Sequence, residues 1–181
     1  LRAAGHAAPI VSVGSTPTAI FAEHLRGVTE MRPGNFVFFD LFQSGLGTCG
    51  EDDIAVSVLA SVLGHHRGRN HILLDAGALA LSKDSGANEH RPGTGYGAIC
   101  LAAAERPEPG LAVLHLHQEH GIVGQSKGLD AIEPLPYARF PVGARVRVLP
   151  SHSCITAAAY DHYYVTEGER VVDVWDRVGG W

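Results

Sequence analysis

Short apolar runs recur along the chain, and from about residue 53 onward almost every run has the pattern of a strand. At 145–148 the chain alternates Arg and Val, which is the period of a half-buried strand. Other runs rich in Val, Ile, Leu and Ala are bounded by Gly, Pro and polar turns. The predicted strands are 54–64, 72–81, 95–101, 111–116 and 144–149, followed by a hairpin of 163–166 with 170–174. This part of the chain is predicted to be rich in β-structure.

The first fifty residues have a different pattern, in which strand-like and helix-like runs alternate. Residues 9–13 form an apolar run typical of a buried strand, and residues 18–25 have helical character. Thr16 or Thr18 is the expected N-cap of this helix. An Arg-Pro-Gly-Asn turn then leads into an aromatic run at 36–39, which we expect to be another buried strand. We therefore expect a short α/β piece ahead of the β-rich part.

Composition and charge narrow the class of protein. Hydrophobic residues make up 45% of the 181 residues and charged residues 18%, which is ordinary globular composition. The net charge is −5 and no block of Lys and Arg stands out, so binding to nucleic acid is not expected. No apolar run approaches the roughly 18 residues of a membrane helix, so a membrane span is not expected either.

The cysteines and the start of the chain indicate context. Cys49, Cys100 and Cys154 do not make a disulfide framework, so a reducing, cytoplasmic location is expected. The chain starts with Leu and reaches its first strand-like run almost at once. We therefore interpret it as the later part of a longer protein.

Two turns near the start of the chain have the character of phosphate-binding loops. Gly14, Ser15 and Thr16 lie between a predicted strand and helix, where backbone N–H groups and the helix dipole point at an anion. Gly34 and Asn35 form a second turn that offers N–H groups, and an arginine precedes them. The alternatives are an ordinary strand-to-helix turn and a plain turn with a surface arginine.

A histidine and a cysteine two residues apart follow the strand predicted at 144–149. If the segment is extended, the side chains of His152 and Cys154 point to the same side. Imidazole and thiolate suit Zn²⁺, and two protein ligands leave the open positions that a catalytic metal needs. The alternative is that Cys154 is a small buried apolar residue.

The turn Gln118-Glu119-His120 follows the strand predicted at 111–116. Its carboxylate and imidazole could serve as an acid/base pair or support a metal ligand. The alternative is a solvated loop.

Lysine is scarce in this chain, with only Lys83 and Lys127. Both lie in polar turn sequences, unlike a desolvated lysine that carries a cofactor covalently. A cofactor of that kind would need a lysine outside these residues.

Several segments, taken together in order and spacing, resemble one known family. They are VSVGSTPTA at 11–19, TEMRPGNFVFFD at 29–40, LLDAGALALSKD at 73–84, QEHG at 118–121, RVRVLPSHSCITAAAYDHYYV at 145–165 and VVDVWDRVGGW at 171–181. This set resembles the later part of the D-serine dehydratase / D-threonine aldolase family, which are pyridoxal-phosphate enzymes with an alanine-racemase-like fold.

The resemblance implies an N-terminal α/β barrel that carries the cofactor and a β-domain that closes over it. Residues 1–50 would be the last strands of that barrel, and residues 51–181 the β-domain with the metal site. The family's cofactor lysine lies near the start of the barrel, which this chain lacks. Gly14-Ser15-Thr16 and Gly34-Asn35 match the positions expected to hold the cofactor phosphate. Arg32 matches an arginine that faces the pyridine nitrogen in the racemases.

His152 and Cys154 match the metal pair of the family. His-x-Cys resembles the zinc-dependent D-serine and D-hydroxyaspartate dehydratases, whereas His-x-Asp resembles the aldolases. The resemblance therefore implies a lyase that uses pyridoxal 5'-phosphate and Zn²⁺ to convert D-serine, or another 3-hydroxy-D-amino acid, to a 2-oxo acid and ammonia. By analogy with racemase-like folds, a homodimer is also implied.

Two other functions stay open on the sequence. One is a D-threonine aldolase, which would release glycine and an aldehyde. The other is an isolated β-domain without catalysis that serves binding or assembly, because this chain lacks the cofactor lysine.

Overall fold

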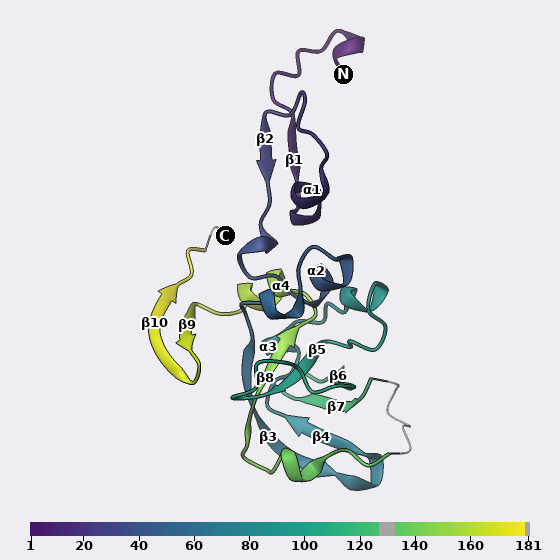
Figure 1. The fold of residues 1–181 in the computed structure, drawn as a ribbon, viewed down its shortest axis with the longest axis vertical. Coiled ribbons are helices and arrows are strands. Elements are labelled where there is room, and N and C mark those ends of the chain that lie inside the picture. Colours follow the sequence, from purple (N-terminus) through teal and green to yellow (C-terminus); the bar gives the residue numbers. More distant parts are fainter. Residues whose placement is uncertain (127–132, 180–181) are drawn as a thin grey trace.

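The computed structural model describes residues 1–126 and 133–179 of the chain (Figure 1). Its largest part is a closed barrel with strand order β3-β4-β7-β6-β5-β8, in which each neighbouring pair is antiparallel. Closure pairs β3 with β8, so the barrel strands all find partners on both sides. The strands are β3 (Val58–His66), β4 (His71–Leu74), β5 (Gly97–Leu101), β6 (Leu111–Leu116), β7 (Gly121–Gln125) and β8 (Arg145–Pro150).

Alternation along the strands decides which side chains fill the barrel. In β3, Val58, Ala60 and Val62 are buried, and the residues between them are exposed or half-buried. In β8, Val146 and Val148 are fully buried, so the strand predicted from the Arg/Val alternation is confirmed. Each such valine contributes about 1.5–3 kcal/mol relative to an exposed position, so this core holds the barrel together.

The first part of the chain forms a small parallel unit that stands away from the barrel (Figure 1). It consists of β1 (Ser12–Gly14), α1 (Thr16–Phe21) and β2 (Glu30–Arg32), with β1 and β2 paired in parallel. The strand predicted at 9–13 forms later, as β1, and the prediction that it is buried is wrong, since β1 has no buried residue and Ile10 is 70% exposed. Parallel strands are normally covered on both faces, and the described chain offers this pair little cover.

The helix α1 begins two residues earlier than predicted. The Ser15 hydroxyl accepts a hydrogen bond from the Thr18 N–H at 3.2 Å, so Ser15 is the N-cap rather than Thr16 or Thr18. Pro17 occupies the first turn, where its missing N–H costs nothing.

The buried strand predicted at 36–39 is also wrong. Asn35–Val37 form a 3₁₀ turn, and Phe36 is 52% exposed. Phe39 has a φ of 53°, which no strand residue adopts, and Asp40 then caps α2 (Leu41–Leu46). A short apolar run does not by itself distinguish a strand from a helical turn, and here the Asp40 cap decides the outcome.

Half of the strand predicted at 72–81 is a helix instead. β4 ends at Leu74, and α3 (Ala78–Leu81) follows after Gly77. A side chain at Gly77 would lie 2.4 Å from the Gln118 carbonyl, so only glycine allows the β6–β7 turn to pack here. The Ala78 N–H donates to the His117 carbonyl at 2.8 Å, and this contact turns the chain out of the sheet.

The hairpin predicted near the end of the chain is confirmed. β9 (His162–Glu167) and β10 (Arg170–Asp176) pair in antiparallel fashion outside the barrel (Figure 1). Val174 and Trp175 are each about half exposed, at 48% and 53%. The hairpin is therefore an arm with apolar side chains on its surface.

The remaining helical elements are short. They are α4 (Ser153–Ala158) and 3₁₀ turns at Arg2–Ala4, Glu51–Asp53, Arg67–Arg69, Gly86–Glu89 and Tyr137–Arg139. Within the described residues, no helix has the length and apolar character needed to cross a membrane.

Candidate metal site and phosphate turns

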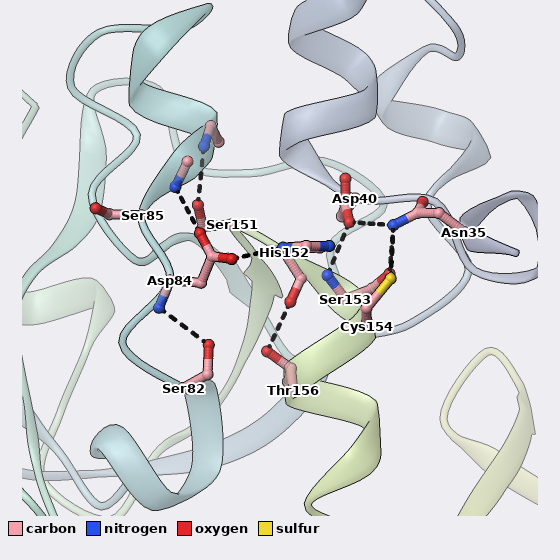
Figure 2. Close-up of polar contacts among 12 residues, drawn as sticks. Asn35, Asp40, Ser82, Asp84, Ser85, Ser151, His152, Ser153, Cys154 and Thr156 are labelled. Carbon is pink, nitrogen blue, oxygen red and sulfur yellow. Dashed lines mark hydrogen bonds and ion pairs between the residues drawn. The ribbon is translucent and has the colours of Figure 1, made fainter. Parts of the chain in front are cut away.

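His152 and Cys154 lie at the junction between β8 and α4 (Figure 2), and α4 lies at one end of the barrel (Figure 1). His152 is the N-cap of α4 with an extended backbone, φ −138° and ψ 112°. The extended triplet predicted at 152–154 is wrong beyond His152, because Cys154 lies in the first turn of α4. The two side chains nevertheless lie close enough to shift each other's pKa, so a helical turn brings together the pair that was expected from an extended strand.

A carboxylate that sequence reasoning missed holds the histidine ring. Asp84 Oδ2 lies 2.6 Å from His152 Nδ1, and Asp84 Oδ1 accepts from the Gly86 N–H at 2.8 Å (Figure 2). An ionised carboxylate has no proton to donate, so it can only accept hydrogen bonds. The proton therefore lies on His152 Nδ1, and the other ring nitrogen is left to face Cys154. The Phe42 ring stacks on the imidazole at 6.1 Å between ring centroids. The imidazole is thus held in position, with Nδ1 on Asp84, before any ligand arrives.

The electrostatics of the pair favour a thiolate. The hydrogen bond with Cys154 is the main cause that raises the pKa of His152 to about 9, against burial, and Asp84 adds to the rise. The hydrogen bond from His152 lowers the pKa of Cys154, and the Asn35 amide adds to this effect. Burial by itself would raise the pKa of the Asp84 carboxyl. Its hydrogen bond with His152 lowers that pKa, and the net result is a lowered pKa. Both shifts favour transfer of the Cys154 proton to the His152 ring.

A buried aspartate joins three segments beneath this pair. Asp40 is fully buried, and its Oδ2 accepts from the Asn35 side-chain amide at 2.6 Å and from the Ser153 N–H at 2.8 Å. Its Oδ1 accepts from the Gln43 N–H at 2.8 Å. Asp40 therefore links the 34–35 turn, α2 and the start of α4 (Figure 2).

The two turns predicted to hold phosphate lie at the same edge of the N-terminal unit. β1 and β2 are parallel with Gly14 opposite Arg32, so the segments that leave them, 14–16 and 34–35, emerge together. The Thr16 hydroxyl accepts a hydrogen bond from the Phe36 N–H at 3.0 Å and joins the two turns. Two segments separated by some twenty residues are thus adjacent, as a shared anion site requires.

Two residues that were expected to contact the cofactor, Asn35 and Arg32, have side chains that bind protein groups instead. The Asn35 side-chain amide points to Asp40 and Cys154, so only the backbone of Asn35 faces the turn. Arg32 Nε donates to the Ser12 hydroxyl at 2.7 Å and lies 3.0 Å from a Glu30 carboxylate oxygen. The Arg32 guanidinium is therefore held along β1 and β2.

The other candidates of the sequence lie in exposed loops or outside the described residues. Gln118 and Glu119 are exposed in the turn between β6 and β7, and the rings of His117 and His120 stack there at 4.5 Å. This matches the solvated-loop alternative. Lys83 lies in the segment between α3 and the 3₁₀ turn at 86–89, and Lys127 lies outside the described residues.

Asp84 and Asp40 each end a segment that the sequence singled out, at 73–84 and 29–40. One usable signal for Asp84 was the Asp-Ser-Gly sequence, in which an aspartate caps the N–H two residues on. No local sequence pattern predicts that Asp84 contacts His152 or that Asp40 contacts Ser153.

Comparisons with known proteins identify the relatives of this chain. The chain matches the family described as "Putative serine dehydratase domain" over residues 55–166. It is 44% identical over 181 residues to D-threo-3-hydroxyaspartate dehydratase of Delftia sp. (strain HT23), covering 100% of this chain and 47% of that enzyme. It is 32% identical over 181 residues to D-serine dehydratase of Dictyostelium discoideum, covering 95% of this chain and 43% of that enzyme. The chain thus spans about half the length of the curated relatives it matches.

Solved structures show the same likeness. The Delftia enzyme superposes with a TM-score of 0.87 at 44% identity, over 100% of this chain and 47% of that one. An alanine racemase-like protein from Idiomarina loihiensis gives 0.84 at 39% identity, over 100% and 47%. Variants of the Delftia enzyme carry alanine in place of a histidine and of a cysteine two positions later, and the cysteine variant is in a metal-free form. Together, the family match and these relatives show that the chain belongs to the D-serine dehydratase / D-threonine aldolase family, with its alanine-racemase-like fold.

Proposed function

We propose that the full-length protein is a pyridoxal-phosphate- and zinc-dependent dehydratase that converts D-serine, or another 3-hydroxy-D-amino acid, to a 2-oxo acid and ammonia. The observation that carries the proposal is the His152–Cys154 pair, whose imidazole is fixed by Asp84 at 2.6 Å. The same His-x-Cys spacing separates the two substituted positions in the Delftia dehydratase variants.

The donor set of the pair fits zinc. The lowered pKa of Cys154, caused mainly by His152, favours the thiolate that a metal needs. Asp84 fixes the His152 tautomer, as carboxylates do for metal-bound histidines. In the described ranges no group of three or more His, Cys, Asp and Glu could hold a metal. Zinc on His152 and Cys154 would therefore take its other ligands from solvent, substrate or other parts of the protein.

The N-terminal unit fits the edge of a cofactor-binding barrel. We propose that residues 1–50 complete an α/β barrel and that residues 51–181 form the domain with the metal site. Ile10 and Phe21 are 70% and 57% exposed, and the rest of such a barrel would cover them. The backbone N–H groups of Gly14, Ser15 and Thr16, with those of Gly34 and Asn35, would hold the cofactor phosphate.

Each residue of the site then has a defined task. When bound, pyridoxal phosphate supplies an electron sink for the substrate α-carbon, and zinc supplies a Lewis acid for the substrate hydroxyl. His152 and Cys154 hold the metal, and Asp84 keeps the proton on His152 Nδ1 so that the other nitrogen stays free to ligate. The covalent cofactor lysine comes from outside this chain in this proposal.

We also propose a homodimer in the cytoplasm. The exposed apolar side chains of the β9–β10 arm, among them Val174 and Trp175, suit a protein interface. All three cysteines are free thiols, which suits a reducing compartment.

The competing activity is D-threonine cleavage, because the chain is also 26% identical to a D-threonine aldolase of Arthrobacter sp.. Cys154 favours the dehydratase, since its thiolate is the softer ligand. An isolated chain without the cofactor lysine is expected to be inactive, so the test requires the full-length protein.

The test is to incubate the full-length protein with pyridoxal phosphate, zinc and either D-serine, a D-3-hydroxyaspartate or D-threonine. The expected products from the first two are 2-oxo acids and ammonia in equal amounts, lost on chelation of zinc and in Cys154→Ala. Glycine and aldehyde from D-threonine, without 2-oxo acid from D-serine, would assign the aldolase instead.

A further inference from the structure

The Asn35 side chain has more acceptors around it than it can serve equally. Its Nδ2 lies 2.6 Å from Asp40 Oδ2, 3.1 Å from Ser153 Oγ and 3.5 Å from Cys154 Sγ (Figure 2). An amide nitrogen carries two hydrogens, so a third acceptor weakens the others. Sulfur is larger than oxygen, so 3.5 Å is an ordinary hydrogen-bond length to Cys154, and this contact joins the amide to the candidate metal ligand.

The orientation of this amide is fixed by its neighbours. Both oxygens of Asp40 accept hydrogen bonds from backbone N–H groups, those of Gln43 and Ser153. The NH₂ group of Asn35, not its carbonyl, therefore faces Asp40 and Cys154. The carbonyl oxygen Oδ1 then points away, and it is buried with no hydrogen-bond partner among the described residues. This side chain is therefore held through its NH₂ group, by Asp40, Ser153 and Cys154.

The backbone of the same residue belongs to the turn proposed for the cofactor phosphate. Gly34 and Asn35 follow β2 directly, and the next N–H, of Phe36, donates to the Thr16 hydroxyl of the other phosphate turn at 3.0 Å. Asn35 therefore has its backbone in one site and its side chain on the metal ligand of the other. Its side chain spans 119 positions of sequence to reach Cys154.

We infer that Asn35 is a positioning residue that couples cofactor binding to metal binding, through its backbone in the phosphate turn and its side-chain contact with Cys154. This inference rests on the proposed function. An anion bound at the turn fixes the Asn35 backbone and so lowers the entropic cost of presenting Nδ2 to the Cys154 sulfur. By linkage, zinc held on Cys154 favours cofactor binding by the same factor.

The experiment measures zinc affinity of the full-length protein by competition with a chelating dye, with and without pyridoxal phosphate. In the wild type, the cofactor is expected to tighten zinc binding about five-fold or more, the lower end of typical coupling. In Asn35→Ala, zinc affinity is expected to fall about ten-fold, and the cofactor should change it less than about two-fold.

Two controls separate this role from general damage. Ser153→Ala removes a competing acceptor from the same cluster but leaves the Asn35–Cys154 contact, so the coupling should be retained. Asn70→Ala removes a different asparagine, which donates to the Glu133 carbonyl at 2.7 Å in the β3–β4 turn, and should lower thermal stability without changing zinc affinity. Circular dichroism establishes that each variant is folded.

The outcomes are distinct. Wild-type coupling retained in Asn35→Ala, no coupling in the wild type, or equal loss in Asn35→Ala and Ser153→Ala would each overturn the inference. Zinc affinity unchanged in Cys154→Ala would instead remove the proposed metal site itself. Activity is not needed for any of these readings.

Discussion

His152 Nδ1 lies 2.6 Å from Asp84 Oδ2, although the two residues are 68 positions apart in the chain. β8 delivers the histidine to the end of the barrel, and the segment after α3 delivers the carboxylate. Because Asp84 is also bonded to the Gly86 N–H, the carboxylate is itself held in place. The barrel topology thus places a rigid acceptor behind the candidate metal ligand.

Asp84→Asn is expected to lower zinc affinity by about 10–100-fold, because the neutral amide no longer fixes the His152 tautomer or raises the basicity of the ring. Metal content after dialysis, measured by mass spectrometry, checks this. The matched control is Asp53→Asn, since Asp53 also accepts from a glycine N–H at 2.8 Å, from Gly50. Equal zinc loss in both variants would contradict a specific role for Asp84.

Cys154→Asp is expected to change the metal preference of the site. A carboxylate is a harder ligand than a thiolate, so affinity for Zn²⁺ should fall relative to Mn²⁺ by about ten-fold or more, about 1.4 kcal/mol. Competition binding of the two ions to wild type and variant checks this. An unchanged zinc-to-manganese ratio would show that Cys154 is not a ligand.

The three thiols are expected to react with iodoacetamide at very different rates in the metal-free protein. His152 lowers the pKa of Cys154, so its thiolate fraction near pH 7 is the highest, whereas burial raises the pKa of Cys100 to about 11. Cys154 should label first and Cys100 last, as followed by peptide mass spectrometry.

The pH dependence of Cys154 labelling in a His152 variant provides a control for this experiment. His152→Ala removes the main cause of the lowered Cys154 pKa, so labelling at pH 7 should slow and recover only as the pH rises. Bound zinc should also protect Cys154. Similar rates for Cys154 in both proteins across pH 6–9 would contradict the thiolate–imidazolium pair.

Asp40→Ala is expected to destabilise the protein by about 2 kcal/mol or more, because it leaves the buried backbone N–H groups of Gln43 and Ser153 without their acceptor. Urea unfolding followed by circular dichroism measures the loss. Asp176→Ala, on the exposed β10 arm, should change the free energy of unfolding by less than about 0.5 kcal/mol. A similar effect of the two substitutions would contradict the linking role of Asp40.

Leu74→Ala is expected to cost about 2–5 kcal/mol, because Leu74 is fully buried in the barrel core. Leu63 is 53% exposed on the paired strand β3, and Leu63→Ala should cost far less. Thermal unfolding of both variants tests the inward and outward assignment of the barrel strands. Equal losses of stability in the two variants would contradict the assignment of Leu74 to the inside and Leu63 to the outside of the barrel.

The local pattern of the chain was enough for several elements. The Arg/Val alternation of β8 and the turn between β9 and β10 are local signals, and both elements form as predicted. The residue types of His152 and Cys154 were also sufficient to propose a metal pair, since ligand chemistry depends on the side chains themselves. The set of segments in order was sufficient to place the chain in its family.

Other features depended on contacts that no local pattern contains. The second half of 72–81 became α3 because the β6–β7 turn packs against Gly77. The misreading of 36–39 is different, since the Asp40 cap of α2 that follows it is a local signal.

The sequence alone thus determined the strand-rich character, the family and the candidate ligands, because periodicity and side-chain chemistry are local properties. Only the tertiary structure decided what supports those ligands. Asp84 and Asn35 reach residues 152 and 154 across 68 and 119 positions, because barrel closure and the packing of the 35–40 segment on the start of α4 bring them together.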